Sequence, residues 1–109
     1  MKIITVPINA QGIKDMEYDS DCSMHVQELK IDNESFYKLY KTGIFDVLNR
    51  TCNVIIDDFE SEWIKYDQLF DAIDEVEKIF KDNTCYELTQ LFMLIKLAIS
   101  KKTGIYFYF

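Results

Sequence analysis

The sequence contains little proline, glycine or histidine. Among 109 residues there are one Pro, three Gly and one His. Such low Gly and Pro content excludes collagen-like and linker compositions, and a single histidine argues against most histidine-dependent hydrolase and metal chemistry. The longest strongly apolar helical stretch, 91–99, is interrupted by Lys96 and falls short of the about 20 residues that a membrane helix needs.

Disulfide and targeting signals are also absent from the sequence. Cys22, Cys52 and Cys85 are odd in number and widely spaced, without a C-x-x-C pair. This usage is typical of reduced thiols in a cytosol rather than of a secreted disulfide framework. The apolar run at 1–8 is interrupted by a threonine and a proline and is too short for a signal-peptide core. We therefore expect a cytoplasmic protein.

Hydrophobic and acidic residues are plentiful. The chain is 49% hydrophobic and 15% aromatic, which predicts a folded chain and one globular domain over residues 1–109. Nineteen acids against twelve bases give a net charge of −7. This balance argues against direct binding to nucleic acid or to an anionic membrane.

Periodic apolar residues predict two main helices. Residues 66–81 carry one apolar stripe, formed by positions 66, 69, 70, 73, 76 and 80. Residues 85–102 are apolar on most faces, and Thr84 and Glu87 before them match a capping box. A short helix is predicted near 33–42, with Asp32 or Asn33 as its cap and Gly43 as its stop.

The other segments predict a small sheet. Strands are expected at 2–8, 53–57 and 105–109, with a weaker one at 25–31 and a loop at 10–23. The fold class is therefore α+β, with a small mixed or antiparallel sheet packed against the two main helices. We expect the C-terminal strand to be covered. An exposed edge there would pair with a second copy, so a monomer or a weak homodimer is expected.

Acidic residues concentrate in one segment, 57–77, which contains nine acids and one base, Lys65. A solvated helix face is one interpretation of such a run, and a docking surface for a basic partner is the other. Trp63 and Tyr66 lie among these acids and could supply contact area, whereas we expect Phe59 to be buried. The predicted partner-binding residues are Asp57, Asp58, Glu60, Glu62, Trp63, Tyr66, Asp67, Asp71 and Asp74.

Residues 15–21 have the acidic spacing that begins a calcium-binding EF-hand loop. The loop would need Gly at its sixth position and Glu at its twelfth, where this chain has Ser20 and Val26. The motif therefore fails, and no metal is predicted.

Cysteine and histidine chemistry has equally little support. Cys22 and His25 have the spacing of zinc ligands, but Cys52 and Cys85 are single residues of the kind usually buried as small hydrophobes. The sequence contains no G-x-G-x-x-G, P-loop or G-x-S-x-G motif. We therefore expect no catalysis and no cofactor.

Two segments carry a resemblance to a known family. Residues 40–49, YKTGIFDVLN, and 55–64, IIDDFESEWI, resemble small acidic immunity proteins of bacterial polymorphic and contact-dependent growth-inhibition toxin systems. This resemblance implies a non-enzymatic cytoplasmic inhibitor that binds its cognate toxin, often a basic nuclease. The alternative is a phage-type acidic inhibitor that mimics nucleic acid on a host defence or nucleic-acid-binding protein. A third hypothesis is an enzyme or metal-binding regulator that uses Cys22 and His25.

Overall fold

The computed structural model describes residues 2–17 and 24–109, and their fold is α+β, as the sequence predicts. The elements in chain order are β1 (Lys2–Pro7), α1 (Ala10–Glu17), β2 (Val26–Ile31), α2 (Asn33–Thr42), α3 (Ile44–Cys52), β3 (Ser61–Lys65), α4 (Tyr66–Asp82), α5 (Tyr86–Lys101) and β4 (Gly104–Tyr108). The three predicted helices at 33–42, 66–81 and 85–102 are confirmed to within one residue at each end.

The four strands form one antiparallel sheet in the order β2-β1-β4-β3. β1 and β4 are the central strands, and they pair Ile3 with Tyr108 although these residues come from opposite ends of the sequence. β4 is therefore covered on both sides by other strands, as expected. β2 and β3 are the two edges of the sheet.

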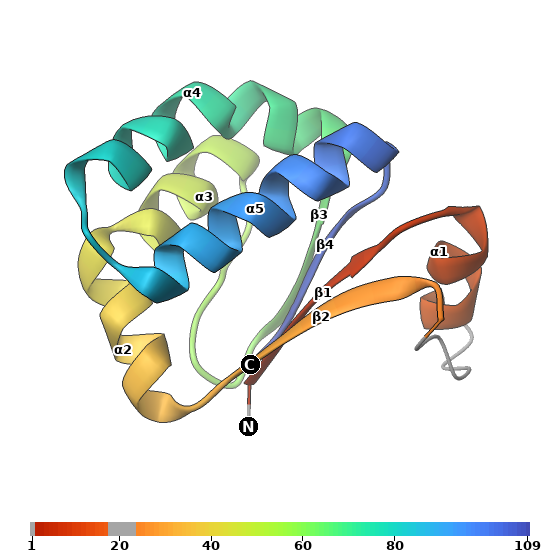
Figure 1. Cartoon of the computed structure of the whole chain (residues 1–109), viewed down its shortest axis with the longest axis horizontal. Coiled ribbons are helices and arrows are strands. Elements are labelled where there is room, and N and C mark those ends of the chain that lie inside the picture. Colours follow the sequence, from red (N-terminus) through yellow and green to blue (C-terminus); the bar gives the residue numbers. More distant parts are fainter. Residues whose placement is uncertain (1, 18–23) are drawn as a thin grey trace.

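Helices α2 to α5 cover one face of the sheet, while α1 lies at the far end of the β1–β2 pair, away from them (Figure 1). Alternate strand residues point into the helical layer because successive side chains of a strand face opposite sides. The core consists of buried apolar side chains from both layers, among them Ile4, Val6, Ile105 and Phe107 from the strands and Leu48, Leu69, Leu91 and Ile95 from the helices. Burial of this apolar surface is the main force that holds the helices on the sheet.

No helix within residues 2–17 and 24–109 combines the length and the apolar character that crossing a membrane requires.

The strand predicted at 53–57 is wrong, and the edge strand lies at β3 instead. Asn53, with a left-handed φ of 55°, ends α3. Asn49 then binds both backbone groups of Ile56: its Nδ2 donates to the carbonyl at 3.3 Å, and its Oδ1 accepts from the N–H at 2.7 Å. These bonds hold the segment against α3 and occupy groups that a neighbouring strand would need.

The loop predicted at 10–23 is wrong in its first half, because residues 10–17 form α1. The side chain of Asn9 accepts a hydrogen bond from the N–H of Gly12 at 2.8 Å, as a helix cap does. Gly12 packs so closely against β2 that a Cβ there would lie 2.2 Å from the carbonyl oxygen of His25. Residues 18–23 lie outside the described part of the chain.

The helix caps were predicted with mixed success. Asp32 caps α2 as expected, since its Oδ1 accepts from the N–H of Ser35 at 2.8 Å, and Gly43 ends α2 with a φ of 85°. The capping box at 84–87 is wrong, because α5 begins one residue later with Cys85 as its N-cap and no side-chain cap bond. Glu87 is thereby shifted to the second helical position, from which it accepts from the Cys85 thiol at 3.9 Å.

We expect Asp32→Ala to lower the urea midpoint of unfolding at neutral pH, because the N–H of Ser35 loses its acceptor. The same hydrogen bond lowers the pKa of Asp32 below its ordinary 3.8. The stabilisation is therefore present above pH 3.8 and is lost as the pH falls through the lowered pKa. Asp32→Asn, which retains an acceptor without a titrating charge, should keep most of the stability and lose this pH dependence. Equal midpoints for wild type and Asp32→Ala at neutral pH would contradict the prediction.

Candidate partner-binding surface

The structure distributes the nine predicted partner-binding residues over three places. Asp57, Asp58 and Glu60 lie in the loop before β3, Glu62 and Trp63 lie on β3, and the other four lie on α4. β3 runs between the loop and α4. The acids of the loop and the acids of α4 therefore lie at opposite ends of the strand (Figure 1). The predicted set is therefore not one continuous patch.

The loop acids form a turn with structural roles of its own. The N–H of Glu60 donates to the carbonyl of Asp57 at 3.2 Å, which closes the turn. The carboxylate of Asp58 pairs with the ammonium of Lys2 at 2.7 Å, and the Lys2 side chain is only 10% exposed. Asp58 therefore compensates a largely buried charge and is a poor site for a charge-reversal experiment.

Phe59, which the sequence led us to expect in the core, is 89% exposed. It occupies the third position of the turn from Asp57 to Glu60 with a φ of 67°, a backbone conformation that is uncommon for a bulky residue. Ile56, three residues earlier, takes the buried place instead and is 3% exposed. The exposure follows from the turn at 57–60, which directs the Phe59 side chain away from the core.

The two β3 residues point to opposite faces of the sheet. Glu62 is on the helical side, half-buried, and its carboxylate accepts from the N–H of Ile55 at 3.3 Å. Trp63 is on the other face, where its ring stacks on Tyr106 with centroids 4.1 Å apart. Trp63 therefore lies on the side of the sheet that faces away from α4.

The remaining predicted residues gather on one exposed side of α4. Asp67, Asp71 and Asp74 follow one another at helical spacing, and Phe70 lies among them with 65% of its surface exposed. Tyr66, at the start of the helix, is also exposed. We call these five residues, Tyr66, Asp67, Phe70, Asp71 and Asp74, the acidic α4 face.

A groove of about 340 Å³ runs beside the acidic α4 face. Ile99 and Lys102, from the end of α5, form its far side, opposite Tyr66 and Phe70. Its surface is mostly apolar, with acids on one rim and a lysine on the other. The surface therefore combines exposed aromatic rings, negative charge and a recess, which are the ingredients of an interface anchor.

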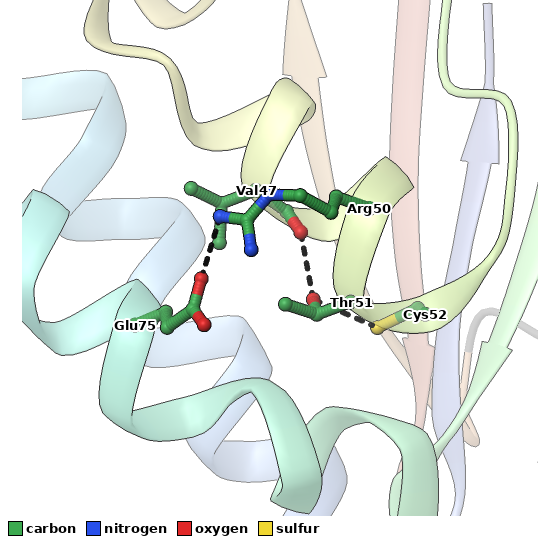
Figure 2. A network of polar contacts seen from close by, with 5 residues as sticks. All are labelled: Val47, Arg50, Thr51, Cys52 and Glu75. Carbon is green, nitrogen blue, oxygen red and sulfur yellow. Dashed lines mark hydrogen bonds and ion pairs between the residues drawn. The ribbon is translucent and has the colours of Figure 1, made fainter.

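Two further acids of α4 already have basic partners. Glu75 accepts a hydrogen bond from the guanidinium of Arg50 on α3 at 2.7 Å (Figure 2). The carboxylate of Glu77 lies 3.5 Å from the ammonium of Lys81. Among the described residues no such ion pair involves Asp67, Asp71 or Asp74. The three acids of the acidic α4 face therefore carry charge that no ion pair among the described residues compensates.

Phe70 belongs to this surface, although its spacing in the sequence predicts it in the apolar stripe of the helix. One residue turns a helix by about 100°, so Phe70 lies well to one side of Leu69, which is fully buried. The buried stripe is formed by Leu69, Ala72 and Val76. The angular offset is a signal that a helical projection of the sequence could have revealed.

The cysteine and histidine residues form no catalytic arrangement within the described ranges. The Cys52 thiol is buried and donates to the carbonyl of Gln68 at 3.6 Å, close to Thr51 in Figure 2. This burial raises its pKa, against a smaller lowering by the Thr51 hydroxyl, which disfavours a nucleophilic thiolate. His25 is paired with the side-chain amide of Asn9 at 3.1 Å, and Cys22 lies outside the described residues. Over residues 2–17 and 24–109, no three acidic, cysteine or histidine side chains are placed to share a metal ion.

Comparisons of this chain with protein-family models, with curated proteins and with solved structures find no match. The candidate surface is therefore defined by exposure, charge and packing alone. By these criteria the acidic α4 face is the candidate, because it combines acids without an ion pair among the described residues, exposed aromatic rings and an adjoining groove.

Proposed function

We propose that this protein is a non-catalytic immunity protein that binds and neutralises a cognate toxin, with a basic nuclease as the expected class. The observation that carries the proposal is the acidic α4 face, where Phe70 is exposed among Asp67, Asp71 and Asp74. The resemblance of residues 40–49 and 55–64 to toxin immunity proteins agrees with this function.

The acids and the aromatic rings would have different roles in such a complex. Unpaired carboxylates raise the rate of encounter with a positively charged partner and fix its orientation. A large ring such as that of Phe70 contributes affinity once it is desolvated in a pocket of the partner. α4 packs against α3, α5 and the sheet, so this surface is held on a rigid support.

The direct test is co-purification of the tagged protein with the product of the adjacent gene, washed at low and at high salt. A stoichiometric complex that suppresses the toxicity of that product is expected. If instead no complex forms and the same bait competes with DNA or RNA for several related host proteins, nucleic-acid mimicry replaces immunity as the function.

Charge reversal locates the surface within that complex. We expect Asp67→Lys with Asp71→Lys to weaken toxin binding by roughly tenfold to a hundredfold and to flatten its salt dependence, because steering charges are removed and reversed. Glu34→Lys with Asp46→Lys, on α2 and α3, is the matched control, since it makes the same total charge change on other helices, and it should bind like wild type. Equal affinities for the two double variants would contradict the role of the acidic α4 face.

A further inference from the structure

The β2 edge of the sheet presents backbone hydrogen-bonding groups in a regular pattern. Among residues 2–17 and 24–109, the strand that pairs with β2 is β1, on one side of it. The N–H of Ile8 donates to the carbonyl of His25 at 2.9 Å, in register with the pairing of Val6 with Gln27. Bonded and non-bonded pairs alternate in an antiparallel ladder, so the odd-numbered residues of β2 bond to β1. The N–H and C=O groups of Val26, Glu28 and Lys30 consequently point outward from the edge.

The charged side chains on the β2 edge are complementary to those on the same edge of a second copy of the chain. Glu28 and Lys30 are both exposed, and their cross-strand partners on β1 are the uncharged Thr5 and Ile3. No ion pair within the described ranges uses either of them. If two β2 strands pair antiparallel about a two-fold axis at Leu29, each Glu28 lies opposite the Lys30 of the other copy. In the same register, residues whose N–H and C=O groups point outward lie opposite each other. The backbone hydrogen bonds and the Glu–Lys ion pairs between the two copies can therefore form together.

Neighbouring two-fold registers lack this agreement. An axis at Glu28 sets two glutamates opposite each other, and an axis at Lys30 does the same with two lysines, which is unfavourable. An axis between two residues would join an outward-facing residue to one that already bonds to β1. Charge and hydrogen bonding therefore favour a two-fold axis at Leu29 over these neighbouring registers.

An apolar groove lies beside this edge, on the helical side of the sheet. It has a volume of about 380 Å³, and Leu29 of β2 and Met93, Leu94 and Leu97 of α5 contribute its apolar surface. Met93 is 65% exposed, although it is an apolar residue in a central helix. A two-fold axis perpendicular to the sheet keeps both helical layers on one side, so the two grooves would join above the paired strands. The Leu29 side chains of both copies would meet there, since a non-hydrogen-bonded pair brings side chains closest.

From these observations we infer that the protein forms a two-fold homodimer through β2, with one continuous eight-stranded sheet. The other edge strand, β3, lacks the pattern: its single acid and single base within Ser61–Lys65, Glu62 and Lys65, point to opposite faces and cannot form symmetric pairs. α4 lies over β3 and β4, at the opposite edge of the sheet from β2. The dimer therefore leaves both acidic α4 faces free and is independent of the proposed function.

Sedimentation equilibrium of the full chain tests the dimer. Wild type is expected at twice the 13.0 kDa chain mass at micromolar concentrations. Glu28→Lys and Lys30→Glu should each raise the dimer dissociation constant by at least roughly tenfold, because both cross-strand pairs become like-charged. An equimolar mixture of the two variants should dimerise again, since the charges are then complementary, and this recovery shows that both variants fold. Lys65→Glu, the same charge change on β3, is the matched control and should sediment like wild type.

Amide hydrogen exchange checks the register at single residues. In the dimer the N–H groups of Glu28 and Lys30 should be protected from exchange, and in the Lys30→Glu monomer they should exchange faster, whereas the N–H of Leu29 stays protected in both. A wild type that remains monomeric at 100 µM, or a Lys30→Glu variant with unchanged affinity, would overturn the inference. A mixture of the two charge variants that stays monomeric would overturn this register.

Discussion

Phe107→Ala is expected to lower the free energy of unfolding by about 3–5 kcal/mol. Phe107 is fully buried on the central strand β4, where its ring packs edge-on against Phe45 at 6.3 Å and Phe109 at 5.6 Å between ring centroids. Truncation removes that apolar contact and leaves a cavity between the sheet and α3 that the rigid surroundings fill only in part. Equilibrium urea denaturation followed by circular dichroism measures the effect.

The matched control is Phe59→Ala, which removes the same ring from an exposed turn. Because Phe59 is 89% exposed, its truncation should change the free energy of unfolding by less than about 0.5 kcal/mol. Similar losses in the two variants, or a loss below about 1 kcal/mol for Phe107→Ala, would mean that the aromatic core is packed differently from this description.

Gly104→Ala is the second substitution with a large expected effect, about 2–3 kcal/mol of lost stability, near the upper end for overpacking. A Cβ at this position would lie 2.5 Å from the carbonyl oxygen of Ile64 and 2.4 Å from Cη2 of Trp63. The first contact is with the backbone of the paired strand, so moving a flexible side chain cannot relieve it. The Trp63 ring, which covers Gly104 and stacks on Tyr106, would also have to shift.

Thermal denaturation and tryptophan fluorescence together test this prediction. Trp63 is the single tryptophan of the chain, so its emission reports directly on the ring that the new methyl group displaces. Gly104→Ala should unfold at a lower temperature and have a red-shifted emission in its folded state. An unchanged melting temperature with unchanged emission would show that the close approach of β3 and β4 at Gly104 is absent.

Helices α2, α4 and α5 are predictable from the sequence because their signals are local. A stripe of apolar residues, a capping Asp32 and a Gly43 stop are all read from consecutive positions, and packing of the same stripe then stabilises the helix. The strands were predicted less well. The apolar run at 53–57 looks more strand-like than Ser61–Lys65, but the pairing of β3 with β4 and the bonds from Asn49 to Ile56 decide the outcome. The β3–β4 pairing links distant residues, and the bonds from Asn49 depend on where α3 ends, so the apolar pattern of the sequence does not reveal either.

The candidate surface was predictable in composition but not in geometry. The excess of acids at 57–77 is evident from the sequence, whereas their separation to the two ends of β3 depends on where the strand lies. Trp63 lies on the far face of the sheet because β3 includes it. Phe70 is exposed among the acids because of its angular offset from the buried Leu69 on α4. The pairing of Asp58 with Lys2 also joins residues far apart in the chain.

The adjacency of β1 and β4 sets the order in which the molecule can be completed during synthesis. Of the four described strands, β1 is made before the other three and has β2 as an early neighbour, but its other neighbour, β4, is made after β2 and β3 (Figure 1). Until β4 leaves the ribosome, β1 exposes a long backbone edge, and β3 has no strand beside it. Closing a loop of this length is slow. The nascent chain therefore passes through a state in which β1 and β3 lack the neighbour that β4 later supplies, and such unpaired strands favour aggregation and chaperone binding.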